Sequence, residues 1–239
     1  MSTTPHFTEA TTGYWQRIVE AEVAGAAGDA GPWRFGYPAR LPDGRVLMLP
    51  IRPLASEPTN QPTHAVASLI LNQAALDVVD ALGQMLAERL RPLAPELVLG
   101  LPTLGLALAP VVARALGHAR YVPMGYSRKF WYDEALSVPV QSITSPAPGK
   151  RVYLDPNQLA LLQGRRVVIV DDAVSTGSTL LAVWDLIASL NIDVVACGVA
   201  MRQGTRWTST LGAMRAAQVV GVFDSPLLRA VPQGWVQRD

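Results

Sequence analysis

Short apolar runs alternate with helix-like segments along the chain from Glu96 onward. The runs are apolar throughout, which is typical of strands buried on both faces, and the segments between them carry apolar residues at helical spacing. This alternation predicts an α/β fold with a doubly wound, mostly parallel sheet and an active cleft at the carboxyl ends of its strands. The predicted strands cover residues 96–100, 120–124, 166–170, 193–201 and 218–223, and the predicted helices cover residues 106–116, 179–190 and 207–216.

The pattern in the N-terminal part is less regular. Apolar residues at helical spacing predict a short helix over residues 14–24 and a long helix over residues 65–90. Between them, residues 33–37 and 45–49 flank a Pro-Asp-Gly turn, which is the composition expected of a hairpin.

These elements divide the chain into three predicted parts. Residues 1–64 are expected to contribute a small hood, residues 65–223 form the core, and residues 224–239 form a tail that can add to the hood. Within the core, residues 125–150 have no clear helical or strand period. Because structureless intervals of this length in a compact domain are usually functional or disordered, we interpret this one as a lid.

Composition narrows the class of protein. The 239 residues suffice for one compact α/β domain with a modest appendage, and 20 Lys and Arg residues against 19 Asp and Glu residues give a formal net charge of +1. Such a chain has no overall field that would gather nucleic acid or anionic lipid, so any anion must be recognised locally. The only cysteine, Cys197, lies in an apolar run and is expected to be a buried thiol.

Neither a signal-like N-terminus nor an apolar run long enough for a membrane span is apparent in the sequence. We therefore expect a cytoplasmic protein with no membrane and no nucleic-acid partner.

A buried strand ends on two adjacent carboxylates. Residues 167–170 are all apolar, Asp171 and Asp172 follow them, and a short polar turn leads into the next predicted helix. Backbone N–H groups and the positive end of the helix dipole make such a turn a phosphate site. Adjacent carboxylates are costly to hold together unless something neutralises or hydrogen-bonds them, and a sugar diol and a divalent cation together would do both. The turn and the first helical residues are Ala173, Val174, Ser175, Thr176, Gly177, Ser178 and Thr179.

Residues 167–179 resemble the signature with which type I phosphoribosyltransferases bind phosphoribosyl pyrophosphate (PRPP). The resemblance implies that Asp171 and Asp172 hold the ribose hydroxyls and act in catalysis, that Mg²⁺ is bound at the same pair, directly or through hydroxyls or water, and that residues 173–179 cradle the 5′-phosphate. A capped helix after a buried strand would explain the hydroxyl side chains but not the acidic pair before them.

Two further segments resemble the same family. The residues after the strand at 96–100 are similar to its pyrophosphate-binding loop, in which backbone N–H groups and the Thr103 hydroxyl would make the contacts. Arg128 and Lys129 resemble the basic entry to the lid of adenine phosphoribosyltransferases, which implies that both act on the departing pyrophosphate. The aromatic residues at 130–132 depart from that lid and leave the nucleobase open. The loop consists of Leu101, Pro102, Thr103, Leu104 and Gly105.

The resemblance implies a phosphoribosyltransferase that moves the ribose 5-phosphate of PRPP to a nucleobase and releases pyrophosphate, with Mg²⁺ as cofactor. It also implies a homodimer, and the lid entry favours a purine. One alternative is a regulator of the same fold that senses PRPP without turnover, but no basic recognition helix precedes the core. An unrelated nucleotide-binding α/β protein ranks last, because the chain contains neither a GxGxxG nor a Walker-type sequence.

Several other residues stay without an assigned role. The histidines are too scattered along the chain to predict a metal site. Residues 201–204 could line a base pocket or simply turn the chain, and an aromatic residue could stack on the base or pack in the core. The histidines are His6, His64 and His118, and the aromatic candidates are Phe35, Tyr37 and Phe223.

Overall fold

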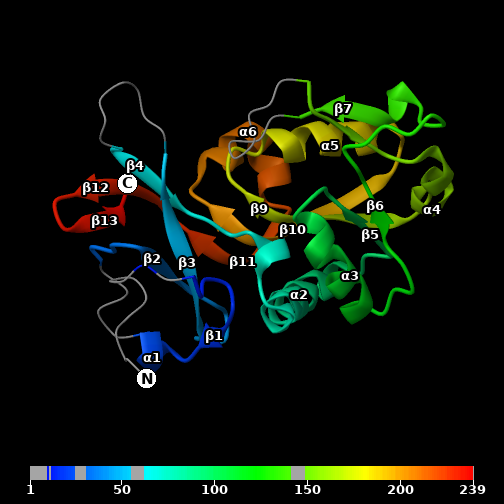
Figure 1. Ribbon diagram of the computed structural model, residues 1–239. Helices are drawn as coiled ribbons and strands as arrows, with labels where there is room; N and C mark the ends of the chain where they lie inside the picture. The colour runs from blue at the N-terminus through cyan, green and yellow to red at the C-terminus, as the bar shows by residue number, and fades with distance from the viewer. Residues whose placement is uncertain (1–9, 11, 25–30, 55–61, 141–148, 239) are drawn as a thin grey trace. The chain divides into compact units, whose positions relative to one another are not determined.

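The computed structural model describes residues 10, 12–24, 31–54, 62–140 and 149–238 of the chain (Figure 1). The chain forms two compact units. One unit consists of Met1–Val78 and Phe223–Asp239, and the other of Val79–Val222. The division falls inside helix α2 (Leu76–Leu90), so the residues between 65 and 78 group with the N-terminal part of the chain.

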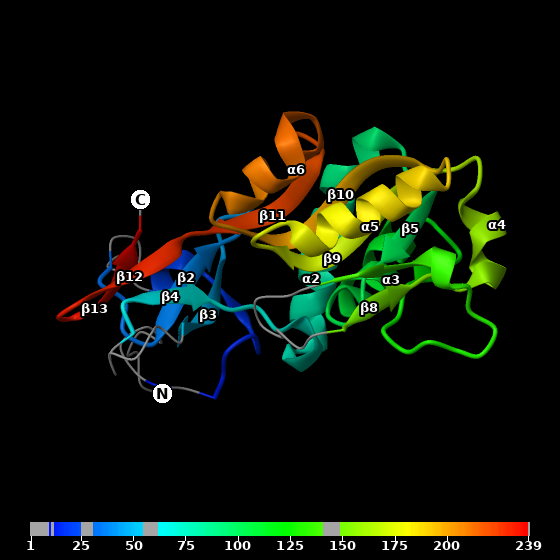
Figure 2. The same ribbon diagram turned by 90° about the horizontal axis from the view of Figure 1, so that it is seen from above.

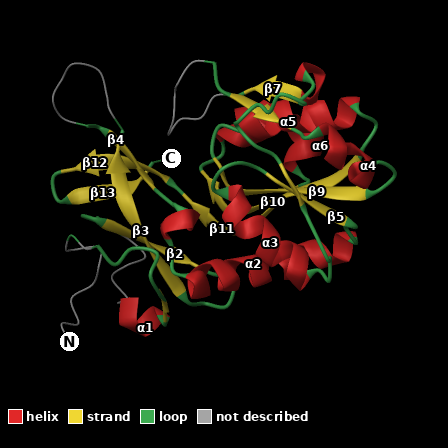
Figure 3. Cartoon of the chain, turned by 45° about the vertical axis from the view of Figure 1, so that its right-hand side comes forward, coloured by secondary structure: helices red, strands yellow, loops and turns green. Residues whose placement is uncertain are grey.

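The unit Val79–Val222 is built on a five-stranded sheet with the order β11-β10-β9-β5-β6. The pairs β6–β5, β5–β9 and β9–β10 are parallel. Helices α2 and α3 cover one face of this sheet, and α5 and α6 cover the other (Figure 3). The predicted doubly wound α/β fold is therefore confirmed. The strands are β5 (Leu97–Gly100), β6 (Val122–Pro123), β9 (Arg166–Val174), β10 (Asp193–Gln203) and β11 (Val219–Ser225), and the other helices are α3 (Gly105–Ala115), α5 (Ser178–Ser189) and α6 (Arg206–Ala216).

The core of this unit explains the apolar runs. Val167 and Ile169 of β9 are fully buried because helices cover both faces of the sheet, and they belong to one cluster with Val183 and Ile187 of α5. Figure 2 shows α5 lying along β9 and β10. Since β5 and β9 are parallel neighbours, their carboxyl ends meet at the same edge of the sheet, which is where the candidate residues follow.

Two central strands run further than the sequence predicts. Strand β9 continues to Val174, so Asp171 and Asp172 lie within it, and β10 continues to Gln203. Pairing across the two strands accounts for the extension, with Ala173 opposite Met201. The edge strand β6, by contrast, is confined to Val122–Pro123.

The interval at residues 125–150 contains more regular structure than its sequence pattern indicates. A 3-10 helix, Glu134–Leu136, leads into β7 (Ser137–Pro139), which pairs antiparallel with β8 (Arg151–Tyr153). The prediction of a structureless interval is therefore wrong for these residues, because the strand pairing is non-local and leaves no period in the sequence. Residues 141–148 lie outside the described part of the chain. A 3-10 helix, Pro156–Gln158, and α4 (Leu159–Leu162) then precede β9.

The unit that contains both termini of the chain has an antiparallel sheet with the order β1-β3-β4-β12-β13, and β2 also pairs with β3. The predicted hairpin is confirmed as β2 and β3, with Ala39 opposite Leu47. The tail after residue 223 joins this sheet through β12 and β13. The strands are β1 (Ile18–Val19), β2 (Gly36–Arg40), β3 (Val46–Pro53), β4 (His64–Ala67), β12 (Leu227–Val231) and β13 (Gly234–Gln237).

Two predicted helices of this unit are wrong in part. The helix over residues 14–24 is reduced to α1 (Ala21–Ala24), because Ile18 pairs with Leu47 in the sheet. The helix over residues 65–90 begins only at Leu76, because the preceding residues form β4 between β3 and β12. In both cases tertiary strand pairing overrides a local helical period. Two 3-10 helices, Leu71–Gln73 and Arg91–Leu93, flank α2.

Candidate active site

The acidic pair lies near the carboxyl end of β9. Asp171 and Asp172 are partly buried, and the backbone N–H of Asp172 donates to Asp171 Oδ1 at 2.9 Å. Burial raises the pKa of Asp171 well above its usual range, and the neighbouring Asp172 carboxylate raises it further. Burial likewise raises the pKa of Asp172 to about 6. The protein itself therefore compensates the charge of the pair only in part, which suits a site for hydroxyls or a cation.

The predicted phosphate loop joins this strand to α5. Gly177 adopts a positive φ of 81° directly before the helix, and a Cβ there would lie 3.2 Å from the Cα of Trp207. Glycine is therefore required both by conformation and by the close approach of α6. The loop leads directly into the N-terminus of α5, and helix N-termini bind anions through their backbone N–H groups.

Side chains of the loop are tied together and to β10. The Ser175 hydroxyl donates to Gln203 Oε1 at 3.0 Å, and the hydroxyls of Thr176 and Ser178 lie 3.0 Å apart. Gln203 is buried at the end of β10. The sequence allowed residues 201–204 either to line a base pocket or to turn the chain. The structure shows neither role for Gln203, whose side chain instead accepts a hydrogen bond from the predicted phosphate loop.

The second predicted loop lies against the acidic pair. The N–H of Leu101 donates to the carbonyl of Val170 at 2.9 Å, and the N–H of Gly105 donates to the Asp171 carboxylate. A Cβ on Gly105 would lie 2.8 Å from both the Cα and the Oδ1 of Asp171. Thr103 is exposed beside this contact, and the Pro102–Thr103 peptide bond is cis. The structure therefore brings the loop and the acidic pair together, and helix α3 starts at the same point.

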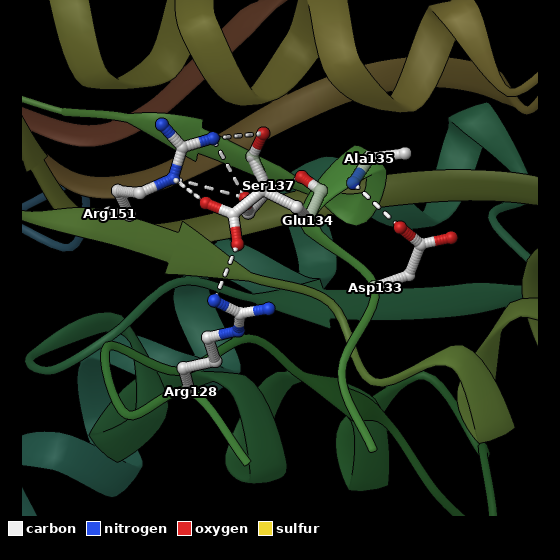
Figure 4. A network of polar contacts seen from close by, with 6 residues as sticks. All are labelled: Arg128, Asp133, Glu134, Ala135, Ser137 and Arg151. Atoms are coloured by element: carbon white, nitrogen blue, oxygen red, sulfur yellow. Dashed lines mark hydrogen bonds and ion pairs between the residues drawn. The ribbon is translucent and has the colours of Figure 1, made fainter. Parts of the chain in front are cut away.

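Arg128 and Lys129 form the predicted basic entry to the lid, and Arg128 is paired with Glu134. Arg128 Nη1 forms an ion pair with Glu134 Oε2 at 3.1 Å, and Arg151 Nε lies 3.3 Å from the other oxygen of Glu134 (Figure 4). Arg151 is further fixed by the Ser137 hydroxyl, to which its Nη2 donates at 2.8 Å. Lys129 is exposed. The contacts of Arg128 thus tie it to the 3-10 helix before β7 rather than to the two loops.

Tyr126 is a site residue that the sequence did not single out. Its hydroxyl donates to the carbonyl of Pro102 at 2.8 Å, and Lys150 Nζ lies 3.7 Å from the centre of its ring. Burial raises the pKa of Tyr126 to about 12, and the carboxylates of Asp171 and Asp172 contribute to the increase. The phenol is therefore close to both the loop and the acidic pair. Tyr126 lies in the interval that has no helical or strand period, so no pattern in the sequence indicated its contact with the second loop.

The acidic pair fits Mg²⁺ only if a substrate completes the coordination. In the part of the chain that the structure describes, no three His, Cys, Asp or Glu residues converge to hold a metal ion. Mg²⁺ typically binds through one or two carboxylates together with phosphates and water, which is a donor set that Asp171 and Asp172 can begin. Their partly compensated charge supports this fit.

The remaining candidates are mostly structural. Cys197 is buried, which confirms the expected buried thiol, and burial raises the pKa of the thiol well above its usual range. His64 lies in β4, His118 Nε2 is 2.9 Å from the Pro95 carbonyl oxygen, and His6 lies outside the described residues. No helix in the described ranges is both long and apolar enough to cross a membrane.

The predicted phosphate loop at the N-terminus of α5, the acidic pair and the second predicted loop meet at one edge of the sheet. This arrangement defines an α/β protein suited to a sugar phosphate that carries charge at both ends.

Comparisons with known proteins agree with that class. A sequence model of the phosphoribosyl transferase domain family matches residues 68–211. The xanthine phosphoribosyltransferase of Chloroflexus aurantiacus is 31% identical over 165 residues, which are 66% of this chain and 75% of that protein. The adenine phosphoribosyltransferase of Oenococcus oeni is 35% identical over 108 residues, 45% of this chain and 58% of that protein. The chain therefore belongs to the phosphoribosyltransferase family, and the predicted family and enzyme class are confirmed.

Solved structures show the same fold. APRTase from Giardia lamblia superimposes with a TM-score of 0.55 at 19% sequence identity, over 73% of this chain and 93% of that one. At this identity the likeness concerns the fold alone, and it supports the type I phosphoribosyltransferase architecture expected from the sequence.

Proposed function

We propose that this chain transfers the ribose 5-phosphate of PRPP to a purine base and releases pyrophosphate. The observation that carries the proposal is the direct contact between Gly105 and Asp171, which joins the second loop to the acidic pair at the end of β9. A substrate with a ribose between two phosphate groups matches these neighbouring sites. The relatives named as xanthine and adenine phosphoribosyltransferases support a purine as acceptor.

In the proposed reaction a ring nitrogen of the base attacks C1 of the ribose as the C1–oxygen bond to pyrophosphate breaks. Positive charge then develops on the ribose, and Asp171 and Asp172 stabilise it while they accept hydrogen bonds from the ribose hydroxyls. Mg²⁺ bound with PRPP would supply positive charge to the leaving pyrophosphate.

The two loops would fix the ends of the donor. The N–H groups and hydroxyls of residues 173–179 bind the 5′-phosphate at the start of α5, as helix N-termini bind anions. Backbone N–H groups of residues 101–105 and the Thr103 hydroxyl bind the pyrophosphate. Arg128 and Lys129 approach the pyrophosphate as it leaves and exclude water from the ribose. A homodimer and a cytoplasmic location are further expectations of this proposal.

The experiment is an assay of pyrophosphate and nucleotide formation with PRPP, Mg²⁺ and one base at a time. Adenine, guanine, hypoxanthine and xanthine form the first panel, and orotate and uracil form the second. Formation of a purine nucleotide in step with pyrophosphate supports the proposal. Tight PRPP binding without product from any base would instead support a PRPP-sensing regulator.

A further inference from the structure

Lys150 lies across an aromatic ring from the second loop. Its Nζ is 3.7 Å from the centre of the Tyr126 ring, and the hydroxyl of the same ring donates to the Pro102 carbonyl at 2.8 Å. One tyrosine therefore connects the ammonium group to the loop that the proposed function assigns to pyrophosphate.

The backbone holds both partners in this arrangement. Gly125, next to Tyr126, exchanges two backbone hydrogen bonds with Tyr153 at 3.0 and 2.8 Å, and the N–H of Val140 donates to the Lys150 carbonyl at 3.0 Å. The Lys150 side chain is half-buried, although lysine side chains usually stay exposed. The position of Lys150, directly before β8, is therefore fixed by the backbone around it.

The distribution of lysines along the chain also draws attention to Lys150. The sequence has 20 Lys and Arg residues, of which 18 are arginines, and its two lysines are Lys129 and Lys150. Both occur within residues 125–150. An ammonium group is a compact charge on a flexible stem, which suits a phosphate group that must first be held and then released. Arginine elsewhere in the chain serves ion pairs and backbone contacts such as those of Arg151.

The surroundings of Tyr126 let the ammonium bind a second partner. Asp171 and Asp172 lie near enough to act on the Tyr126 phenol, so the ring that carries the ammonium is close to the acidic pair as well as to residues 101–105. A cation–π contact at a partly exposed site is weak, so it holds the ammonium without immobilising it. The ammonium has three N–H donors, so it can donate a charge-assisted hydrogen bond to a phosphate oxygen while it stays over the ring.

We propose that Lys150 is a further pyrophosphate-binding residue and that Tyr126 is its positioning residue. This inference rests on the proposed function. In the free protein the Tyr126 ring holds the Lys150 ammonium near residues 101–105. In the complex, Lys150 Nζ donates a hydrogen bond to an oxygen of the pyrophosphate. No bond is broken in this step.

The test uses the small number of lysines. In the full-length Lys129→Arg variant, Lys150 is the remaining lysine, so an amine-acetylating reagent followed by peptide mass spectrometry reports on its accessibility alone. Magnesium pyrophosphate is expected to slow acetylation of Lys150 at least threefold, whereas Mg²⁺ alone is not. An acetylation rate at Lys150 that magnesium pyrophosphate leaves unchanged, in protein that binds it, would overturn the proposal.

Binding measurements provide the second arm. Lys150→Met is expected to raise the Kd for magnesium pyrophosphate about tenfold, and Lys150→Arg should restore it to within about threefold of the original value, since one charge-assisted contact accounts for on the order of a tenfold change. Arg114→Met, which removes an exposed charge near the end of α3, is the matched control and should have no effect.

Tyr126→Leu separates positioning from folding. Relative to Tyr126→Phe, which also lacks the hydrogen bond to Pro102 but keeps the ring, it is expected to weaken pyrophosphate binding in the original protein but to add nothing in the Lys150→Met background, since both changes remove the cation–π contact. Additive effects would overturn the positioning role of Tyr126. If the original protein binds pyrophosphate and makes nucleotide while Lys150→Met is neutral, this inference fails and the proposed function stands. If it binds neither PRPP nor pyrophosphate, both fail.

Discussion

Arg128 and Glu134 form an ion pair, with 3.1 Å between Nη1 and Oε2, and Glu134 at the same time binds Arg151 through its other oxygen. One carboxylate therefore holds two guanidinium groups. For Arg128 to reach a departing pyrophosphate it must leave Glu134, whereas Arg151 stays fixed by Ser137. The ion pair competes with the role that the sequence predicts for Arg128.

Glu134→Gln should therefore tighten the binding of magnesium pyrophosphate. Arg128 is more than half exposed, and exposed ion pairs of this kind contribute about 0.2–1 kcal/mol, so the Kd should fall by up to about fivefold. Isothermal titration calorimetry at low and high salt measures the effect, which should shrink as salt rises. Glu88→Gln, on the exposed part of α2, serves as control. Weaker binding in Glu134→Gln would mean that Glu134 prepares Arg128 for pyrophosphate rather than restrains it.

The acidic pair should be essential for binding the donor. PRPP with Mg²⁺ is expected to raise the Tm, because a ligand that binds only the folded state adds roughly 2.7 kcal/mol at a hundredfold excess over Kd. The double variant Asp171→Asn, Asp172→Asn should lose most of this increase. Differential scanning fluorimetry with and without PRPP measures it, and a full increase in the double variant would remove the pair from the site.

The same variant should be more stable than the original protein when no ligand is present. Burial raises the pKa of Asp172 to about 6 from an ordinary 3.8, and that of Asp171 is raised as well. Between about pH 4 and pH 6 the folded protein therefore binds more protons than the unfolded chain, so the pair costs stability as the pH rises through this window.

The shift of Asp172 alone corresponds to a cost on the order of 3 kcal/mol above pH 6, and this cost disappears towards pH 4. Thermal unfolding across this range should show a Tm advantage for the double Asn variant that grows with pH. A constant difference at every pH would mean that the two carboxylates titrate normally in the folded protein.

Lys129 should matter more for catalysis than for binding. Negative charge grows on the pyrophosphate as its bond to C1 breaks, so a cation that contacts it then stabilises the transition state more than the bound substrate. Lys129→Ala is expected to lower kcat by on the order of a hundredfold while the Kd for PRPP changes much less. Single-turnover kinetics together with PRPP titration separate the two quantities. An equal loss in both would assign Lys129 to ground-state binding.

The sequence predicted those parts of the fold that a local pattern can carry. The buried run at Val167 and its neighbours, followed by two acids and a glycine-containing turn, is continuous in sequence, so strand, loop and helix start could all be read from it. The antiparallel sheet of the other unit could not, because β4 pairs with β3 and with the distant β12, and its own alanines and valine resemble the start of a helix.

The residues of the candidate site likewise differ in whether a local sequence pattern could predict them. Residues 171–179 and 101–105 occur in consecutive stretches with their own motifs, whereas Tyr126, Lys150 and Gln203 acquire their places only through contacts between stretches far apart in the chain. The assignment of Arg128 to pyrophosphate stays a prediction, and its pairing with Glu134 could not be foreseen, since both residues lie in a segment without a periodic pattern. The requirement for Mg²⁺ and the homodimer also stay predictions.

Strands β5 and β9 are hydrogen-bonded neighbours, and the loop that follows β5 is also bound to β9, because the Leu101 N–H donates to the Val170 carbonyl and the Gly105 N–H donates to the Asp171 carboxylate. Neighbouring strands are spaced about 4.8 Å apart, and this spacing cannot stretch without breaking the sheet. The loops proposed to bind the 5′-phosphate and the pyrophosphate are therefore held at a fixed separation. If both loops bind anions as proposed, a donor whose charged ends are further apart or closer together than those of a pentose 5-phosphate with pyrophosphate at C1 would reach only one of them. The sheet would then select the length of the substrate before any side chain contacts the base.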